Sequence, residues 1–168
     1  MEDKLRRKLT DLRISVTDRC NFRCRYCMPE ELYGEAYEFL SRDQVLSFEE
    51  IVRLTKIFIK LGINKIRLTG GEPLVRKNIE ELISSISRLD KNIDLAMTTN
   101  GYLLNKFSNI LFSSGLRRLT ISLDSLDNDI FQKMSGKKFS VEDILKGISS
   151  AKEAGFKNIK INSVIKKG

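Results

Sequence analysis

The sequence predicts an α/β fold of about five parallel strands with outer helices, arranged as part of a (β/α) barrel. Two observations predict it. Strand-like runs alternate with segments of helical periodicity along the 168-residue chain, and βα repeats in series give parallel strands joined by right-handed crossovers. Each strand-like run also alternates apolar and polar residues, as a strand with two different faces does. The repeat pattern alone leaves an open doubly wound sheet as the alternative.

The first predicted strand covers 11–17, where Leu, Ile and Val residues occupy alternate positions. It leads into 18–46, a segment longer than a strand-to-helix connection needs, and we therefore expect this segment to be functional. A helix is expected at 48–61, because Ser47 and Glu50 form a capping box and apolar residues then recur at helical spacing.

The same alternation continues along the chain. A strand at 64–69 precedes a helix at 79–89, whose apolar residues fall on one stripe. A strand at 93–98 then precedes a helix at 103–114, which stops at Gly115 because glycine is a usual residue just past a helix end.

A fourth strand, expected at 118–123, is followed by a short helix near 127–134 and by a longer one at 141–154. The longer helix begins with a second capping box, in which a serine precedes an aspartate at the required spacing. A fifth strand is expected at 158–165. Because no linker interrupts the series, residues 1–168 are predicted to form one domain.

The polar faces of the predicted strands carry three cations, Arg13, Arg67 and Lys160. The apolar faces must meet the helices, so the polar faces are expected to line a wet, cationic interior, unlike the apolar interior of an ordinary (β/α)8 barrel. Burying three like charges is costly unless an anion pairs with them, and Arg suits bidentate phosphate contacts. Two alternatives stay open: the strands are phased wrongly and these charges are on the surface, or the sheet is antiparallel with one face in solvent, which the intervening helices disfavour.

Composition and charge exclude several classes of protein. The chain carries 30 basic and 22 acidic residues, a net charge of +8, which suits an anionic substrate or a nucleic acid. It contains no histidine, which excludes Cys/His zinc fingers, histidine bases and Ser-His-Asp triads. No apolar run approaches membrane-spanning length, and the charged start MEDKLRRKL lacks the apolar middle of a secretory signal. We therefore predict a cytoplasmic location.

The chain has three cysteines, Cys20, Cys24 and Cys27, all in the segment that follows the first predicted strand. Active sites of parallel α/β folds lie at this end of the strands. In a reducing compartment clustered thiols indicate metal binding, and an odd number argues against paired disulfides. A structural zinc ion would need a fourth ligand that no further Cys or His supplies. Three thiolates on a four-iron cluster, by contrast, leave one iron open for chemistry.

Three polar motifs follow later strands at the same end of the predicted sheet. Thr69-Gly70-Gly71-Glu72-Pro73 follows the second strand, and its paired glycines let backbone groups approach a ligand closely, although Gly-Gly is also an ordinary turn. The motifs TTNG at 98–101 and SLD at 122–124 follow the third and fourth strands. Each of these two is also typical of a turn or a helix cap.

The string LRISVTDRCNFRCRYCMPEE, together with TGGEPL, TTNG, SLD and KINSVIKKG, resembles the radical S-adenosylmethionine (radical SAM) enzymes. Within them it is most similar to the GTP 3′,8-cyclase family of molybdenum cofactor biosynthesis. The resemblance implies a partial (β/α) barrel of radical SAM type and a lyase that binds a [4Fe-4S] cluster, S-adenosyl-L-methionine and GTP. It implies no catalytic residue beyond the cluster and the radical derived from S-adenosylmethionine.

The same resemblance assigns residues of this sequence to each ligand. The implied cluster ligands are Cys20, Cys24 and Cys27. The implied S-adenosylmethionine contacts are Tyr26, Gly70, Gly71, Glu72 and Ser122. The implied GTP contacts are Arg13, Arg67, Thr98 and Lys160, three of which are the cations that strand parity places in the interior.

Proteins of this cyclase family are considerably longer, and they add a sixth strand and a C-terminal region with a second cysteine-bound cluster. The chain is therefore expected to be a truncated radical SAM core, unable to complete cyclisation alone and left with an unpaired strand edge. Its expected partners are GTP and a reducing electron-donor protein, with no membrane and no nucleic acid. Homodimerisation and association with a separate C-terminal half are left open.

Two other functions would account for parts of the sequence. A radical SAM relative that modifies a peptide or a tetrapyrrole would share the cysteine segment and the GGEP motif. A non-enzymatic basic module that binds metal or nucleic acid would explain the net charge of +8 and the three thiols. The sequence shows no stacking platform with interleaved aromatic residues, which disfavours a nucleic-acid-binding module.

Overall fold

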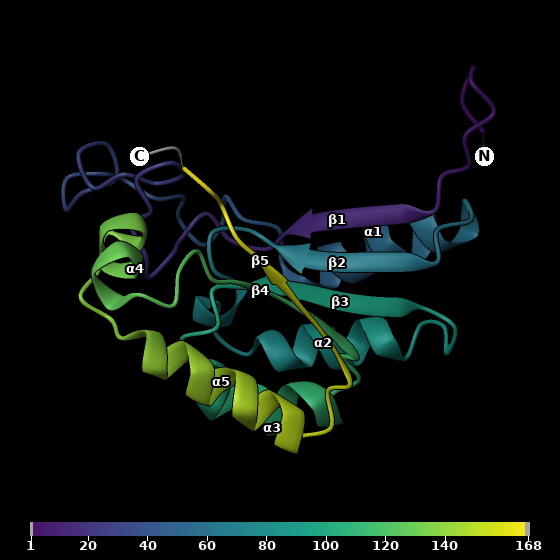
Figure 1. The fold of residues 1–168 in the computed structure, drawn as a ribbon. Coiled ribbons are helices and arrows are strands. Elements are labelled where there is room, and N and C mark those ends of the chain that lie inside the picture. Colours follow the sequence, from purple (N-terminus) through teal and green to yellow (C-terminus); the bar gives the residue numbers. More distant parts are fainter. Residues whose placement is uncertain (1, 167–168) are drawn as a thin grey trace.

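The fold is a single five-stranded sheet covered by helices, and a computed structural model describes it for residues 2–166 (Figure 1). The last two residues of the KINSVIKKG motif lie outside the described residues. The strands are β1 (Asp11–Ser15), β2 (Lys65–Thr69), β3 (Asp94–Thr99), β4 (Arg118–Ser122) and β5 (Asn158–Asn162). All neighbouring strands are parallel and lie in chain order, β1-β2-β3-β4-β5. A doubly wound sheet reverses its strand order at a switch point, so the consecutive order confirms the partial barrel.

The predicted helices all form. They are α1 (Phe48–Lys60), α2 (Ile79–Ser87), α3 (Leu104–Ser113), α4 (Asn128–Ser135) and α5 (Val141–Glu153), joined by a short 3-10 helix, η1 (Pro73–Val75), that the sequence pattern does not predict. Both capping boxes are present with their reciprocal hydrogen bonds. Helices α1, α2, α3 and α5 cover one face of the sheet, and α4 lies at its end (Figure 1).

Two predicted strands extend two or more residues too far at their C-terminal ends. β1 stops at Ser15 and β5 stops at Asn162, rather than at 17 and 165. Beyond β5 the chain bonds instead to the segment after β4, where the Ser163 hydroxyl donates to the Leu123 carbonyl at 2.5 Å and the Val164 N–H donates to Asp124 at 2.9 Å. Alternation within 158–165 could not reveal these bonds, because Leu123 and Asp124 lie 40 residues earlier in the chain, beyond the end of β4.

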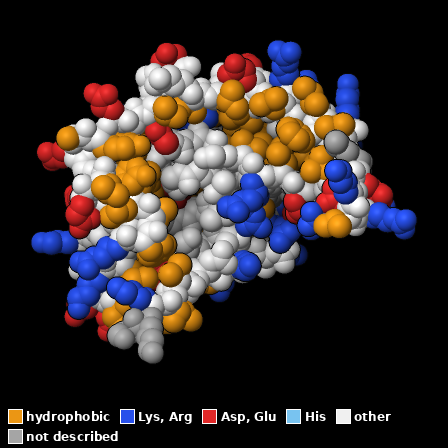
Figure 2. Space-filling view, turned by 90° about the horizontal axis from the view of Figure 1, so that it is seen from above, with side chains coloured by type: hydrophobic (Ala, Val, Ile, Leu, Met, Phe, Trp, Pro, Cys, Tyr) orange, Lys and Arg blue, Asp and Glu red, His pale blue; other side chains and the backbone are white. Residues whose placement is uncertain are grey.

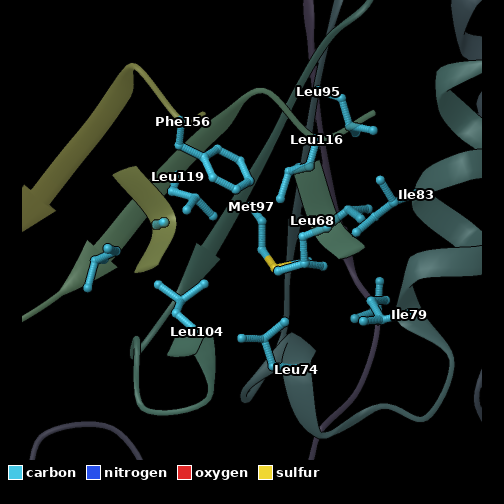
Figure 3. Packing of buried hydrophobic residues seen from close by; sticks show 14 of the residues in the cluster. Leu68, Leu74, Ile79, Ile83, Leu95, Met97, Leu104, Leu116, Leu119 and Phe156 are labelled. Carbon is cyan, nitrogen blue, oxygen red and sulfur yellow. The ribbon is translucent and has the colours of Figure 1, made fainter. Parts of the chain in front are cut away.

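The core lies between the sheet and the helices. The helix-facing side chains of the three central strands are at most 1% exposed: Ile66, Leu68, Leu95, Met97, Leu119 and Ile121. Met97 points toward Leu68, its partner in register, at the centre of this cluster (Figure 3). Each such side chain contributes about 1.5–3 kcal/mol by burial. The alternation of apolar and polar residues therefore predicts the two faces of the central strands correctly.

The edge strand β5 departs from this pattern. Ile161 is 44% exposed, although its partner in register on β4, Ile121, is fully buried. Within residues 2–166 no strand pairs with the outer edge of β5. The expectation that the apolar face of every strand meets helices is thus wrong at β5, because β5 is an edge strand and the helices within residues 2–166 leave Ile161 uncovered.

No helix within residues 2–166 is long and apolar enough to cross a lipid bilayer.

We expect Ile161→Lys to reduce self-association, because a charge on an exposed apolar edge strand blocks edge-to-edge pairing. Its effect on the free energy of unfolding should stay within about 1 kcal/mol, since the side chain is half exposed. Light scattering against concentration, together with denaturant unfolding, measures both. Ile121→Lys is the matched control and should prevent folding, because it buries an unpaired charge. Equal effects of the two changes would contradict the assignment of β5 as an exposed edge.

Candidate metal centre

The three cysteines lie in the cysteine loop, which we define as residues 18–28 and which leaves the C-terminal end of β1. Cys20 and Cys24 are partly buried, Cys27 is exposed, and all three thiols are free. Burial raises the pKa of Cys20; burial and then the neighbouring Cys20 raise the pKa of Cys24 to about 12. Cys27 also contributes to both shifts, so the three sulfurs share one electrostatic neighbourhood. The raised pKa values mean that the thiolates of Cys20 and Cys24 are costly to form in the free protein. A bound metal cation stabilises the thiolate form and offsets this cost.

The number and kind of available ligands decide which metal group fits this loop. Zinc draws its ligands to about 2.3 Å from one point. The described residues contain no group of three Cys, Asp or Glu side chains placed to bind a single metal ion, and a structural zinc ion would also need a fourth ligand, which the three cysteines of a chain without histidine do not supply. An iron–sulfur cluster takes an all-sulfur donor set, in which each cysteine binds a different iron. The residues present therefore fit an iron–sulfur cluster better than a zinc ion.

One apolar side chain anchors the loop. Phe22, between the first two cysteines, is only 3% exposed. Its ring lies 6.0 Å from that of Phe131 and 5.4 Å from that of Phe139, which stacks on Tyr102 at 4.0 Å. Its backbone N–H donates to Cys20 Sγ at 3.4 Å. The sequence marks this anchor only as a single apolar residue in a polar segment.

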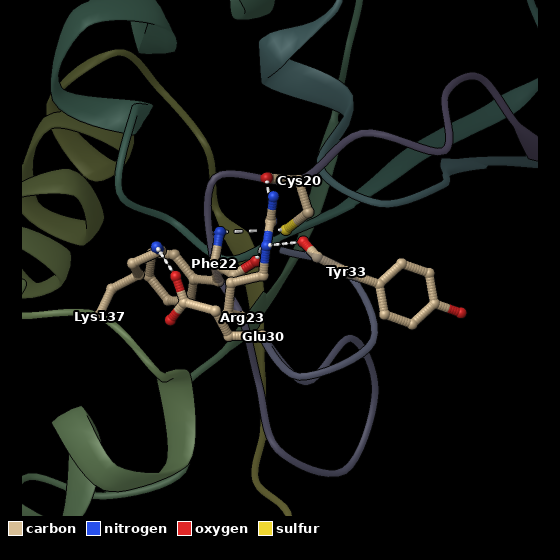
Figure 4. A network of polar contacts seen from close by, with 6 residues as sticks. All are labelled: Cys20, Phe22, Arg23, Glu30, Tyr33 and Lys137. Atoms are coloured by element: carbon tan, nitrogen blue, oxygen red, sulfur yellow. Dashed lines mark hydrogen bonds and ion pairs between the residues drawn. The ribbon is translucent and has the colours of Figure 1, made fainter. Parts of the chain in front are cut away.

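The Arg23 side chain organises the loop from within (Figure 4). Its guanidinium donates to the carbonyl oxygens of Cys20 and Phe22, each at 2.8 Å, and to that of Tyr33 at 2.8 Å. Its backbone N–H donates to the Ser135 carbonyl at 2.9 Å, at the end of α4. Arg23 therefore ties the cysteine loop both to itself and to a helix more than a hundred residues away. No local pattern in the sequence indicates this role.

The Gly-Gly turn after β2 meets the start of the loop backbone to backbone. The Gly71 N–H donates to the Thr17 carbonyl and the Glu72 N–H donates to the Arg19 carbonyl, both at 2.8 Å. A Cβ at Gly71 would lie 2.2 Å from the Arg19 carbonyl oxygen, closer than any real contact. The glycine is needed for this approach between two backbones.

The Glu72 carboxylate points into the protein. It is 1% exposed and accepts hydrogen bonds from the Leu74 N–H at 3.0 Å, the Thr99 hydroxyl at 2.7 Å and the Asn100 N–H at 2.7 Å. Burial raises the pKa of Glu72 to about 7, against the lowering effect of these three donors. Its side chain therefore links the turn after β2 to the end of β3, and a contact with S-adenosylmethionine stays a prediction.

Two further predicted cofactor contacts share one cavity. Tyr26 and Ser122 line a cavity of about 450 Å³, together with Asp124 and residues 161–164. The Tyr26 hydroxyl donates to Asp124 Oδ2 at 2.8 Å, and burial together with this bond raises the pKa of Tyr26. Asp124 thus joins the cysteine loop to the end of β4, a role that the SLD motif alone does not specify.

The predicted cations lie on the face of the sheet opposite the core. Arg67 donates to the hydroxyls of Thr120 at 2.7 Å and Thr98 at 3.3 Å. Arg67 and Lys160 line a cavity of about 270 Å³. Arg13 pairs in register with Arg67 on the neighbouring strand and is exposed, but it does not line this cavity.

Two cations that line the same cavity, Arg118 and Lys157, are not among the predicted site residues. Arg118 pairs in register with Ala96 of β3, as Arg67 does from the other side, and it forms an ion pair with Asp94. Strand parity could have identified Arg118. In the view from above, the molecule is hollowed near its centre and lysine and arginine side chains gather beside the hollow (Figure 2).

Comparison with known proteins gives a family match along most of the chain. The model of the radical SAM superfamily matches residues 14–168. A GTP 3′,8-cyclase of Staphylococcus haemolyticus is 49% identical over 168 residues, 100% of this chain and 49% of the relative. A GTP 3′,8-cyclase of Acidothermus cellulolyticus is also 49% identical, over 100% of this chain and 46% of the relative. The chain spans about half the length of the curated relatives it matches.

Solved structures support the fold. Streptococcus suis SuiB bound to S-adenosylmethionine superposes with a TM-score of 0.76 at 23% identity, covering 94% of this chain and 34% of that one. Methylornithine synthase superposes with a TM-score of 0.68 at 15% identity, covering 94% of this chain and 45% of that one.

We expect Gly71→Ala to displace the cysteine loop, because the added Cβ collides with the Arg19 backbone. The free energy of unfolding should fall by about 2 kcal/mol or more, and less iron should be retained after anaerobic reconstitution. Gly62→Ala is the control: unlike Gly71, Gly62 has a positive φ of 108°, which strains an alanine, but its Cβ would meet nothing closer than 3.9 Å. It should cost about 1–2 kcal/mol and leave iron uptake unchanged. Normal iron uptake by Gly71→Ala would refute the role given to this turn.

Proposed function

Because the chain belongs to the radical SAM superfamily, we propose that it carries the catalytic core of a GTP 3′,8-cyclase, a lyase of molybdenum cofactor biosynthesis. One observation carries this proposal: the same sheet positions three free thiols and a cationic cavity. The loop with the thiols follows the C-terminal end of β1, and the cavity lies on the polar face of the sheet. The 49% identity to proteins named GTP 3′,8-cyclase favours GTP over a peptide or a tetrapyrrole as substrate. The family match disfavours a non-enzymatic basic module.

The cofactors of this function are a [4Fe-4S] cluster and S-adenosyl-L-methionine. Cys20, Cys24 and Cys27 would hold the cluster through their thiolates. When bound, the two cofactors together supply one-electron cleavage of a sulfonium bond and a radical that removes a hydrogen atom from the substrate. The protein supplies position: Phe22 fixes the loop in the core, and Arg23 holds three of its carbonyl oxygens.

The cavity beside the loop is suited to S-adenosylmethionine. Tyr26 and Ser122 line it, and Asp124, which also lines it, accepts a hydrogen bond from the Tyr26 hydroxyl. Gly70 and Gly71 bring backbone groups to the start of the cysteine loop, where an amino acid ligand could meet them. Glu72 would act through the turn that it stabilises, since its carboxylate is already bonded within the protein.

The cationic cavity is suited to the phosphates of GTP. Arg67 and Lys160 present charge to one space of about 270 Å³, and Arg13 extends the cationic surface to β1. The hydroxyl of Thr98 lies 3.3 Å from the Arg67 guanidinium and helps to hold it in the cavity. Guanidinium groups bind phosphate oxygens through paired, charge-assisted hydrogen bonds.

We propose further that a reducing electron-donor protein serves the cluster and that the chain works in the cytoplasm, where free thiols persist. The chain matches about half of each relative. We therefore propose that complete cyclisation also requires a C-terminal half like that of the relatives. Homodimerisation stays an open prediction.

Anaerobic reconstitution with iron and sulfide tests the cofactor assignment. We expect an iron–sulfur absorption and, after reduction, a paramagnetic signal that changes on adding S-adenosylmethionine. Replacing any one of Cys20, Cys24 and Cys27 by Ala should abolish the signal, because the chain has no spare cysteine. Uptake of zinc with no iron would instead support the basic metal-binding module.

Equilibrium binding of GTP tests the substrate assignment. We expect Arg67→Ala and Lys160→Ala each to weaken GTP binding about tenfold or more, since a hydrogen bond to a charged group contributes about 1.5–3 kcal/mol. Lys60→Ala, in the last turn of α1, removes the same charge from a helix end and should leave the affinity unchanged. Unchanged affinity in both cavity variants would leave the GTP assignment without support.

A further inference from the structure

Asn100, the first residue after β3, contacts both the Gly-Gly turn and the cysteine loop. Its side chain is largely buried, with 9% of the residue exposed. Its backbone N–H donates to Glu72 Oε2 at 2.7 Å. Its side-chain Nδ2 donates to Asn21 Oδ1 at 2.7 Å and lies 4.0 Å from Cys20 Sγ. Asn100 is therefore a direct link between the end of a central strand and a thiol of the candidate metal centre.

The orientation of the Asn100 amide follows from its own hydrogen bonds. Its Oδ1 accepts the Tyr102 N–H at 3.1 Å, so the NH₂ group must be the one that faces the cysteine loop. Of the two N–H bonds, one is used by Asn21 Oδ1 and the other is free to point at the Cys20 sulfur. The Phe22 N–H, at 3.4 Å, is a second donor to the same sulfur.

The backbone of Asn100 is also held in place. Glu72 is buried and accepts from Leu74, Thr99 and Asn100, so the turn after β2 and the end of β3 form one unit. The strands β2 and β3 are hydrogen-bonded neighbours. The side-chain amide of Asn100, which extends from this unit, therefore has a fixed position relative to the cysteine loop.

An N–H that points at a cluster-bound thiolate changes the electronic properties of the cluster. Reduction adds negative charge to an iron–sulfur cluster, and hydrogen bonds to its sulfurs stabilise the reduced form and raise the reduction potential. The effect is larger where solvent is excluded, and Cys20 is partly buried while Cys27 is exposed.

We propose that Asn100 is a positioning residue that holds the cysteine loop against β3 and directs an amide N–H to Cys20 Sγ, raising the reduction potential of the bound cluster. This inference rests on the proposed function, because it requires a cluster on the three cysteines. Glu72 supports the same arrangement by fixing the Asn100 backbone.

The test is the midpoint potential of the reconstituted cluster, followed by its paramagnetic signal during one-electron reduction with dithionite. Asn100→Ala removes the donor and should shift the midpoint to more negative potential. Asn100→Asp keeps the shape and the acceptor for Tyr102 but places a negative charge near the sulfur, and its shift should be larger in the same direction. Asn109→Asp makes the same charge change at an exposed position of α3 and should leave the midpoint unchanged.

A second variant guards against failure of the Asn100 variants to fold. Asn21→Ala removes the loop acceptor that orients the amide and leaves β3 intact, so it should give a smaller negative shift. Clusters with an unchanged midpoint in the Asn100 and Asn21 variants would overturn this inference and leave the proposed function standing. Failure of the unaltered chain to assemble any cluster would overturn both.

Discussion

The position of the three thiols depends on a close approach between two stretches of backbone. The turn at Gly71 donates two hydrogen bonds to the residues that lead from β1 into the cysteine loop. This is possible only because no side chain at Gly71 separates the two stretches of backbone. The turn also carries Glu72, whose buried carboxylate bonds to the end of β3. The ends of three neighbouring strands are thus joined before any ligand is considered.

The loop itself is held in the same way, by contacts to distant elements rather than by regular structure. Phe22 fills an aromatic cluster with Phe131, Phe139 and Tyr102. Arg23 bonds to the end of α4 through its backbone and to the loop carbonyls through its side chain. Supporting contacts of this kind are what a metal centre requires, because its ligands must be held within a fraction of an ångström. The part of this segment that carries the three thiols is therefore held by contacts to distant elements.

The one-sided sheet explains how a cationic surface can lie next to a hydrophobic core. All the strands run in the same order in sequence and in space, with helices on one face. The apolar residues of the central strands face those helices, and Arg67, Thr98 and Thr120 occupy the other face. Arg67 is only partly buried there and is hydrogen-bonded to two hydroxyls, so it does not carry the full cost of burial. Such a face can hold an anion without disturbing the core.

Local features of the sequence determined the five strands and five α-helices, the two faces of the central strands and the identity of the three thiols. The capping boxes at Ser47 and Ser140, the alternation within the central strands and the spacing of the cysteines all involve residues close together in the chain. Only the tertiary structure decided which groups support these thiols. Asn100 reaches Cys20 across 80 positions and Asp124 reaches Tyr26 across 98. It also decided that β5 leaves Ile161 exposed and stops at Asn162. These contacts form where the ends of parallel strands meet, and no local periodicity specifies which side chains meet there.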